Sequence, residues 1–164
     1  MKRTKLLTGL MFTGTSLFFI LTGCKKNNDG GGNGISATVS GTAWQSQYAT
    51  GVNYLGSTLL TGAYGKGSDT TMITIDIPDS VKVNEPDDLY LTTVSYTRKS
   101  TQTTYSGGFS GAYYSHGTVL VTSWDKNGHK IAGTFSGVLY NDNNNGDDSV
   151  KVENGHFNSS YTEY

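Results

Sequence analysis

The chain has 164 residues, a mass of 17.6 kDa and a formal net charge of −1, a length that fits one domain with a short appendage. Only 15% of its residues are charged and 12% are aromatic, which excludes a disordered polyelectrolyte, and its charge balance excludes the basic surface of a nucleic-acid-binding protein. Its one Cys excludes a disulfide framework and a Cys-based zinc site.

Residues 1–23 predict a bacterial lipoprotein signal peptide. Three positive charges in the first five residues precede an apolar stretch, Leu6 to Leu21, which is interrupted by Thr and Gly. This stretch is shorter than the roughly 20 apolar residues of a transmembrane helix and is typical of a cleaved signal. Its end, Leu21-Thr22-Gly23-Cys24, resembles the lipobox. The resemblance implies cleavage before Cys24 and acylation of that residue; the alternative is an ordinary secretory signal with an incidental Cys.

A lipidated Cys24 predicts a location in the cell envelope. Two or more acyl chains hold a protein on a membrane without a transmembrane helix. Lys25 follows the Cys, and lipoproteins without Asp at that position favour the outer membrane. Periplasmic and surface-facing orientations both stay open. The expected partner is therefore the membrane, through the lipid, with a further protein or glycan partner not identified.

Residues 24–36 predict a flexible tether, and residues 37–164 a single domain. Within the tether, residues 25–34 are rich in Gly and Asn and contain nothing that can bury apolar surface. The domain holds seven Lys and Arg against twelve Asp and Glu, a formal charge of −5. Such a balance is typical of a solvated surface and disfavours attraction to nucleic acid.

After the tether, alternation of apolar and polar side chains predicts β-strands. The clearest run, 71–77, places Ile73, Ile75 and Ile77 on one face, and Pro78 ends it. Other predicted strands are 35–47, 57–64, 89–99, 102–107 and 111–116.

A hairpin is predicted from 118–124 and 131–140, because Asn127-Gly128 is a strong turn signal. A two-residue turn would place Leu120 and Trp124 on the inner face. A three-residue loop with Gly128 left-handed would pair Asp125 with His129 and turn Val119 and Val121 inward instead. We favour the second register, because it separates polar from apolar residues better, and it leaves Trp124 outside.

The last predicted strand is 149–153, followed by a bulge or turn at Asn154-Gly155. Together these elements predict an all-β fold, an antiparallel β-sandwich or a flattened β-barrel of about eight or nine strands.

Five short segments carry a further resemblance: Val39-Ser40-Gly41-Thr42-Ala43-Trp44, Gly117-Thr118-Val119, Thr122-Ser123-Trp124-Asp125, Ile131-Ala132-Gly133-Thr134-Phe135-Ser136 and Asn154-Gly155-His156-Phe157. They resemble an uncharacterised family of small Bacteroidetes-type lipoproteins, a β-rich domain of unknown function. The likeness covers roughly residues 36–161. It implies the fold and the location and carries over no catalytic or binding residue.

The stretch 141–148 is the weak calcium candidate, with Asp142, Asp147 and Asp148 as its carboxylates. Aligned to an EF-type loop through Gly146, it lacks the leading Asp, and Glu153 falls one place after the closing position. A polar hairpin loop also explains the composition. We therefore expect no metal and no cofactor.

No residue pattern predicts an enzyme. His116, His129 and His156 lack metal-ligand spacing, and the sequence has no nucleophile elbow and no phosphate-binding loop. The carboxylate pairs Asp87-Asp88 and Asp76/Asp79 are not framed by apolar residues that would raise a pKa. We expect no catalytic residues; an extracytoplasmic hydrolase is the second alternative and would require two convergent carboxylates.

The aromatic residues give the first alternative, a surface glycan-binding protein. Exposed rings stack on the apolar faces of sugars, and the candidates for contact are Trp124, Tyr113, Tyr114 and Tyr105. The competing interpretation is that these rings are ordinary strand residues that pack across strands. The leading expectation is a membrane-anchored, non-enzymatic β domain that serves as an interaction or structural module.

Overall fold

The computed structural model describes residues 34–89, 91–107, 109–110, 113–114, 116–143 and 148–164. The predicted signal peptide, Cys24 and residues 25–33 of the tether lie outside the described residues. Strand β1 begins at Gly34, so residues 34–36 of the predicted tether belong to the sheet.

The described part of the chain is all-β, as the sequence predicts, but it has more strands than expected. The strands are β1 (Gly34–Val39), β2 (Thr42–Gln45), β3 (Tyr48–Tyr54), β4 (Ser57–Tyr64), β5 (Thr71–Pro78), β6 (Pro86–Asp88), β7 (Thr93–Arg98), β8 (Thr103–Ser106), β9 (Phe109–Ser110), β10 (Tyr113–Tyr114), β11 (His116–Asp125), β12 (Lys130–Asn141), β13 (Ser149–Ser160) and β14 (Thr162–Glu163). A single 3₁₀ turn, η1 (Gly67–Asp69), joins β4 to β5.

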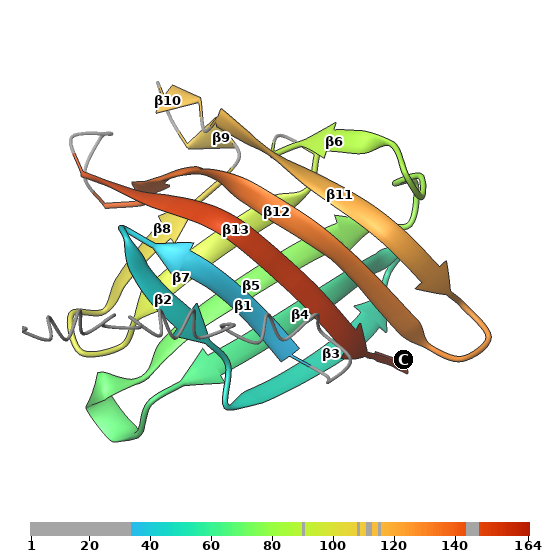
Figure 1. The fold of residues 1–164 in the computed structure, drawn as a ribbon, viewed down its shortest axis with the longest axis horizontal. Coiled ribbons are helices and arrows are strands. Elements are labelled where there is room, and N and C mark those ends of the chain that lie inside the picture. The colour runs from blue at the N-terminus through green and yellow to red at the C-terminus, as the bar shows by residue number, and fades with distance from the viewer. Residues whose placement is uncertain (1–33, 90, 108, 111–112, 115, 144–147) are drawn as a thin grey trace, which may run out of the picture.

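Twelve of these strands form one mostly antiparallel sheet. Its order is β14-β3-β4-β5-β7-β8-β12-β13-β1-β2, with β11 paired to both β12 and β6, and only β14 with β3 is parallel. In the view of Figure 1, β1, β11, β12 and β13 lie in front of β3, β4, β5 and β7. Among the described strands the sheet does not close, because its paired path ends at β14 and at β2.

One tight turn and one crowded glycine explain where the observed strands differ from the predicted ones. The predicted strand 35–47 is the hairpin β1–β2, because Ser40 and Gly41 both adopt positive φ, 47° and 79°. Strand β3 was not predicted. Its inward position is occupied by Gly51, where a Cβ would lie 2.8 Å from Leu60 Cδ2, so apolar alternation is absent there.

The hairpin β11–β12 contains both registers that the sequence left open. Val119 pairs with Phe135 and Val121 with Gly133, as the favoured register requires. Nearer the turn, however, Asp125 pairs with Lys130 and Trp124 with Ile131. A β-bulge at Thr122 separates the two registers. The extra residue moves each side chain after it to the opposite face of the sheet from the one it would occupy in a regular strand.

The expectation that Trp124 lies outside is therefore wrong. Its pairing with Ile131 places it on the inner face, where it packs against the core. The left-handed residue of the turn is also different from the one expected: it is His129, with φ of 50°, while Gly128 donates its N–H to Asp125 Oδ1. In contrast, Asn154-Gly155 forms the predicted bulge, within a continuous β13.

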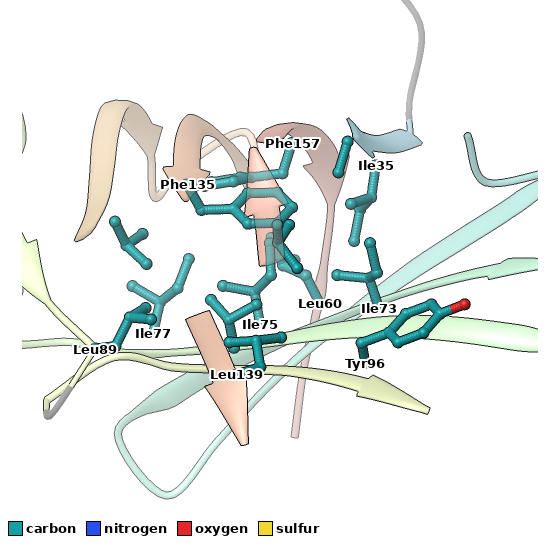
Figure 2. Packing of buried hydrophobic residues seen from close by; sticks show 14 of the residues in the cluster. Ile35, Leu60, Ile73, Ile75, Ile77, Leu89, Tyr96, Phe135, Leu139 and Phe157 are labelled. Carbon is teal, nitrogen blue, oxygen red and sulfur yellow. The ribbon is translucent and has the colours of Figure 1, made fainter. Parts of the chain in front are cut away.

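The core fills the space between the two halves of the sheet. Ile73, Ile75 and Ile77 are fully buried, which confirms the face predicted from their alternation. Figure 2 shows this cluster, with Leu89 and Tyr96 at its opposite ends.

Leu89 fills a space that three glycines leave open. It precedes β7, and its side chain is 1% exposed. A Cβ added to Gly107, Gly117 or Gly137 would lie 2.6–2.9 Å from Leu89 Cδ1. The glycines and the leucine therefore fit one another, and this end of the core is filled with apolar atoms.

Candidate functional site

At the other end of the core, the inner face of the sheet changes from apolar to polar. Leu60, Ile75 and Val94 are cross-strand neighbours on β4, β5 and β7, and all three are buried. The last cross-strand row on the same face is polar and consists of Tyr64, Thr71, Arg98 and Thr103. Because directly paired residues share a face, these four side chains form one row at the end of the sheet.

A groove of about 800 Å³ lies between this row and the hairpin β1–β2. We call it the rim groove; the side chains used below are Trp44, Tyr64, Asp69, Tyr96 and Arg98. Trp44 Nε1 donates a hydrogen bond of 2.8 Å to Thr71 Oγ1, which ties β2 to β5 across the groove. Trp44 and Tyr96 are only 8% and 6% exposed, whereas Tyr64 is 49% exposed. Tyr64 is therefore the ring of this groove that a ligand can cover.

Arg98 is held in place by two aromatic rings. Its guanidinium carbon lies 5.6 Å from the centre of the Tyr96 ring and 5.4 Å from that of Tyr105. Hydrogen bonding to the Tyr96 side chain holds the pKa of Arg98 above its ordinary value, against the opposing effect of burial. Figure 2 shows the Tyr96 hydroxyl directed away from the apolar cluster. The cation is thus fixed at the boundary between the core and the rim groove.

Behind Arg98, a carboxylate is held by two neutral donors. Asp148 Oδ2 accepts hydrogen bonds from Asn141 Nδ2 at 3.0 Å and from the Tyr105 hydroxyl at 2.9 Å. These hydrogen bonds, with that of Asn141 the larger influence, hold the pKa of Asp148 below its ordinary value. Burial, followed by the hydrogen bond to Asp148, raises the pKa of Tyr105.

These shifts predict that the protein loses stability in acid through Asp148. A carboxyl whose pKa is lower in the folded state stabilises the fold above its unfolded pKa, about 4, and this contribution disappears as the pH falls through the folded value. Chemical denaturation between pH 2 and pH 6 should show a free energy of unfolding that falls with pH. The variants Asp148→Asn and Tyr105→Phe should both have a shallower pH dependence than the wild type. A wild-type slope in Asp148→Asn would contradict the prediction.

The proposed glycan contacts do not form one platform. Tyr105 is 4% exposed, and Trp124 donates its Nε1 hydrogen to the Tyr161 hydroxyl at 3.1 Å, with Lys126 Nζ 4.9 Å from its ring centre. Tyr105 pairs with Asn141 and Trp124 pairs with Ile131, at opposite ends of β12. At 3.3 Å per residue, Tyr105 and Trp124 are therefore about 30 Å apart. Tyr113 and Tyr114 belong to β10, but their side chains lie outside the described residues.

Two of the three predicted calcium ligands, Asp142 and Asp148, accept hydrogen bonds from protein groups. Asp142 Oδ2 accepts from Ser106 Oγ, Asp148 is bonded as above, and Asp147 lies outside the described residues. Over the described ranges, no group of three or more His, Cys, Asp or Glu side chains could hold a metal ion. His116 starts β11, His156 lies within β13, and His129 Nδ1 lies 3.4 Å from Glu163 Oε1.

The carboxylate pairs considered for hydrolysis also have local partners. Asp76 accepts a hydrogen bond from Ser57 Oγ, and Asp79 accepts one from Asn53 Nδ2 at 3.0 Å. Asp87 accepts one from Thr92 Oγ1 at 2.8 Å. Each of these aspartates ties two chain segments together.

No family model, no curated protein and no solved structure matches the sequence. In the part of the chain that the structure describes, no helix is long and apolar enough to span a membrane.

Proposed function

We propose that this protein is a lipoprotein of the cell envelope, anchored through Cys24, whose β domain binds a ligand in the rim groove. The anchor is inferred from the sequence, from the signal-like residues 1–23 and the motif that ends at Cys24. The resemblance to small Bacteroidetes-type lipoproteins supports the same location. We infer that the sheet folds into two sandwich-like layers around the core, which holds the groove in a fixed shape.

The observation that carries a binding role is the composition of the rim groove. An exposed Tyr64, a fixed Arg98 and several hydroxyl and amide groups converge on a space of about 800 Å³. Concave sites of a few hundred cubic ångströms with a few fixed polar groups are typical of ligand binding. This composition supports an interaction module more directly than a purely structural one.

A glycan is the ligand class that these groups favour. Tyr64 offers a half-exposed ring, and Thr42, Gln45 and Asn154 line the same groove with groups that can bond sugar hydroxyls. The glycan contacts proposed from sequence were elsewhere, on Trp124, Tyr105, Tyr113 and Tyr114. We therefore propose Tyr64 as the stacking residue in their place.

Binding through Tyr64 can be tested on a glycan array. We expect the purified full-length protein in detergent to retain at least one glycan, and Tyr64→Ala to weaken that binding about tenfold or more, as the loss of one stacked ring implies. The matched control is Tyr54→Ala, because Tyr54 is similarly exposed but lies on the outer face of β3. Equal binding by Tyr64→Ala and the wild type would contradict this site.

The anchor predicts a second result. Replacing the lipidated residue by Cys24→Ala should move the protein from the membrane fraction to the soluble periplasmic or extracellular fraction, because acyl chains supply the membrane affinity. Ultracentrifugation followed by immunoblotting measures the distribution. Undiminished membrane association of Cys24→Ala would show that another feature holds the protein there.

A further inference from the structure

Positive charge is concentrated around the rim groove, although the domain as a whole is acidic. Residues 37–164 carry seven Lys and Arg against twelve Asp and Glu. Three of the seven cations, Lys66, Arg98 and Lys99, lie in or beside the rim, in the segments that connect β4 to β5 and end β7. The two segments are adjacent, because Lys99 N donates to Thr70 O at 3.0 Å. Asp69 is an acidic residue that lines the groove. Its backbone N–H donates a hydrogen bond to the Lys66 carbonyl oxygen at 3.1 Å.

Arg98 carries the charge that a ligand would meet. In the ranges that the structure describes, its side chain forms no ion pair with a carboxylate. The rings of Tyr96 and Tyr105 hold the guanidinium instead, and Asp148 faces the Tyr105 hydroxyl rather than the groove. A guanidinium presents a planar pair of donors that matches a carboxylate, and holding it in advance reduces the entropy lost on binding.

The distance between Arg98 and Tyr64 fits a chain of sugars. Tyr64 pairs with Thr71, and Thr71 pairs with Arg98, so two strand spacings, about 10 Å, separate the first and last of these residues. All three lie on the inner face, at the rim. One sugar ring on Tyr64 would therefore place a linked ring within reach of Arg98.

We propose that the rim groove binds an acidic saccharide that contains uronic-acid units. Arg98 pairs with a uronate carboxylate, Tyr64 stacks on the neighbouring ring, and Lys66 and Lys99 add long-range attraction. The inference rests on the proposed binding function of the groove and adds the charge of its ligand.

Isothermal titration calorimetry with uronate trimers tests this proposal. The probes are the trimers of galacturonate, glucuronate and mannuronate, each with its neutral methyl-esterified form, titrated into the full-length protein in detergent. We expect at least one acidic trimer to bind, and its ester to bind about tenfold more weakly, since one charged hydrogen-bonded pair contributes about that factor. Arg98→Gln should lose the same factor, Arg98→Lys should lose less, and the distant Lys130→Gln should behave as the wild type.

The contrary results are distinct. If the acidic and esterified forms bind equally to the wild type and to Arg98→Gln, the acidic ligand is wrong, while the binding function of the groove stands if Tyr64→Ala still weakens binding. Binding of inorganic phosphate as tight as that of the trimer, at equal ionic strength, would overturn the saccharide in favour of a simple anion site. Failure of all three acidic trimers to bind would overturn the inference, and the glycan array decides separately whether the groove binds a neutral sugar. Circular dichroism of each variant confirms that it is folded.

Discussion

Leu89→Ala is expected to lower the free energy of unfolding by about 2–5 kcal/mol, the range for removing a buried leucine. The cost should lie toward the upper end of this range. Leu89 fits the space left by Gly107, Gly117 and Gly137, and these positions have no side chains that could move into the cavity. Chemical denaturation followed by tryptophan fluorescence measures the change.

Leu91→Ala is the matched control for this substitution. Leu91 lies two residues further along the same connection but is 61% exposed, so its loss should change stability by no more than about 0.5 kcal/mol. Leu89→Met should retain most of the wild-type stability, because it conserves volume. Similar losses in Leu89→Ala and Leu91→Ala would show that the glycine-lined space does not depend on its leucine.

Gly133→Ala should destabilise the protein by about 3 kcal/mol, because the added carbon has no room. A Cβ at Gly133 would lie 2.2 Å from Leu120 O and 2.4 Å from Phe157 Cζ. One neighbour is backbone in the next strand and the other is a buried ring, so neither can move freely. The change is measured by the same denaturation experiment.

Gly41→Ala is the control for Gly133→Ala, because it introduces backbone strain without crowding. Gly41 has a φ of 79° with nothing within 4 Å of its added Cβ, so its substitution carries only the left-handed cost of about 1–2 kcal/mol. We expect Gly133→Ala to cost more. The opposite order would mean that β11 and the Phe157 ring can move away from β12 to admit a methyl group.

The sequence predicts the parts of this fold in which each strand has an obvious inner and outer face. Ile73, Ile75 and Ile77 alternate with polar residues and are fully buried, and strand β4 occupies the predicted range 57–64. Strand β3 offers no such pattern, because Gly51 holds an inward position that has no space for a side chain. A glycine that is required because no side chain fits adds nothing to the alternating hydrophobic pattern of its strand.

A single extra residue in β11 explains why the predicted position of Trp124 was wrong. Both candidate registers were correct over part of the hairpin, and the bulge at Thr122 changes one into the other. Nothing in Thr122-Ser123 distinguishes a bulge from a regular strand before the partner strand is placed.

The rim groove could not be predicted, because its residues come from separate strands. Tyr64, Thr71 and Arg98 become neighbours only through the pairing of β4, β5 and β7, and Trp44 reaches them from the opposite end of the sheet path. The sequence signal that was present, a cluster of aromatics between 105 and 124, pointed to residues that are close in the chain. Strand pairing, not chain proximity, determines which of these side chains meet.

The direction of β1 has a consequence for access. The preceding chain joins the sheet at Gly34, and the turn at Ser40 and Gly41 lies at the far end of that strand, about 20 Å away at 3.3 Å per residue. The turn therefore lies one strand length from the point where the chain enters the sheet. In the anchored arrangement proposed above, the chain that leads to Cys24 and the turn that lines the rim groove lie at opposite ends of β1, so the anchor does not join the domain at that turn.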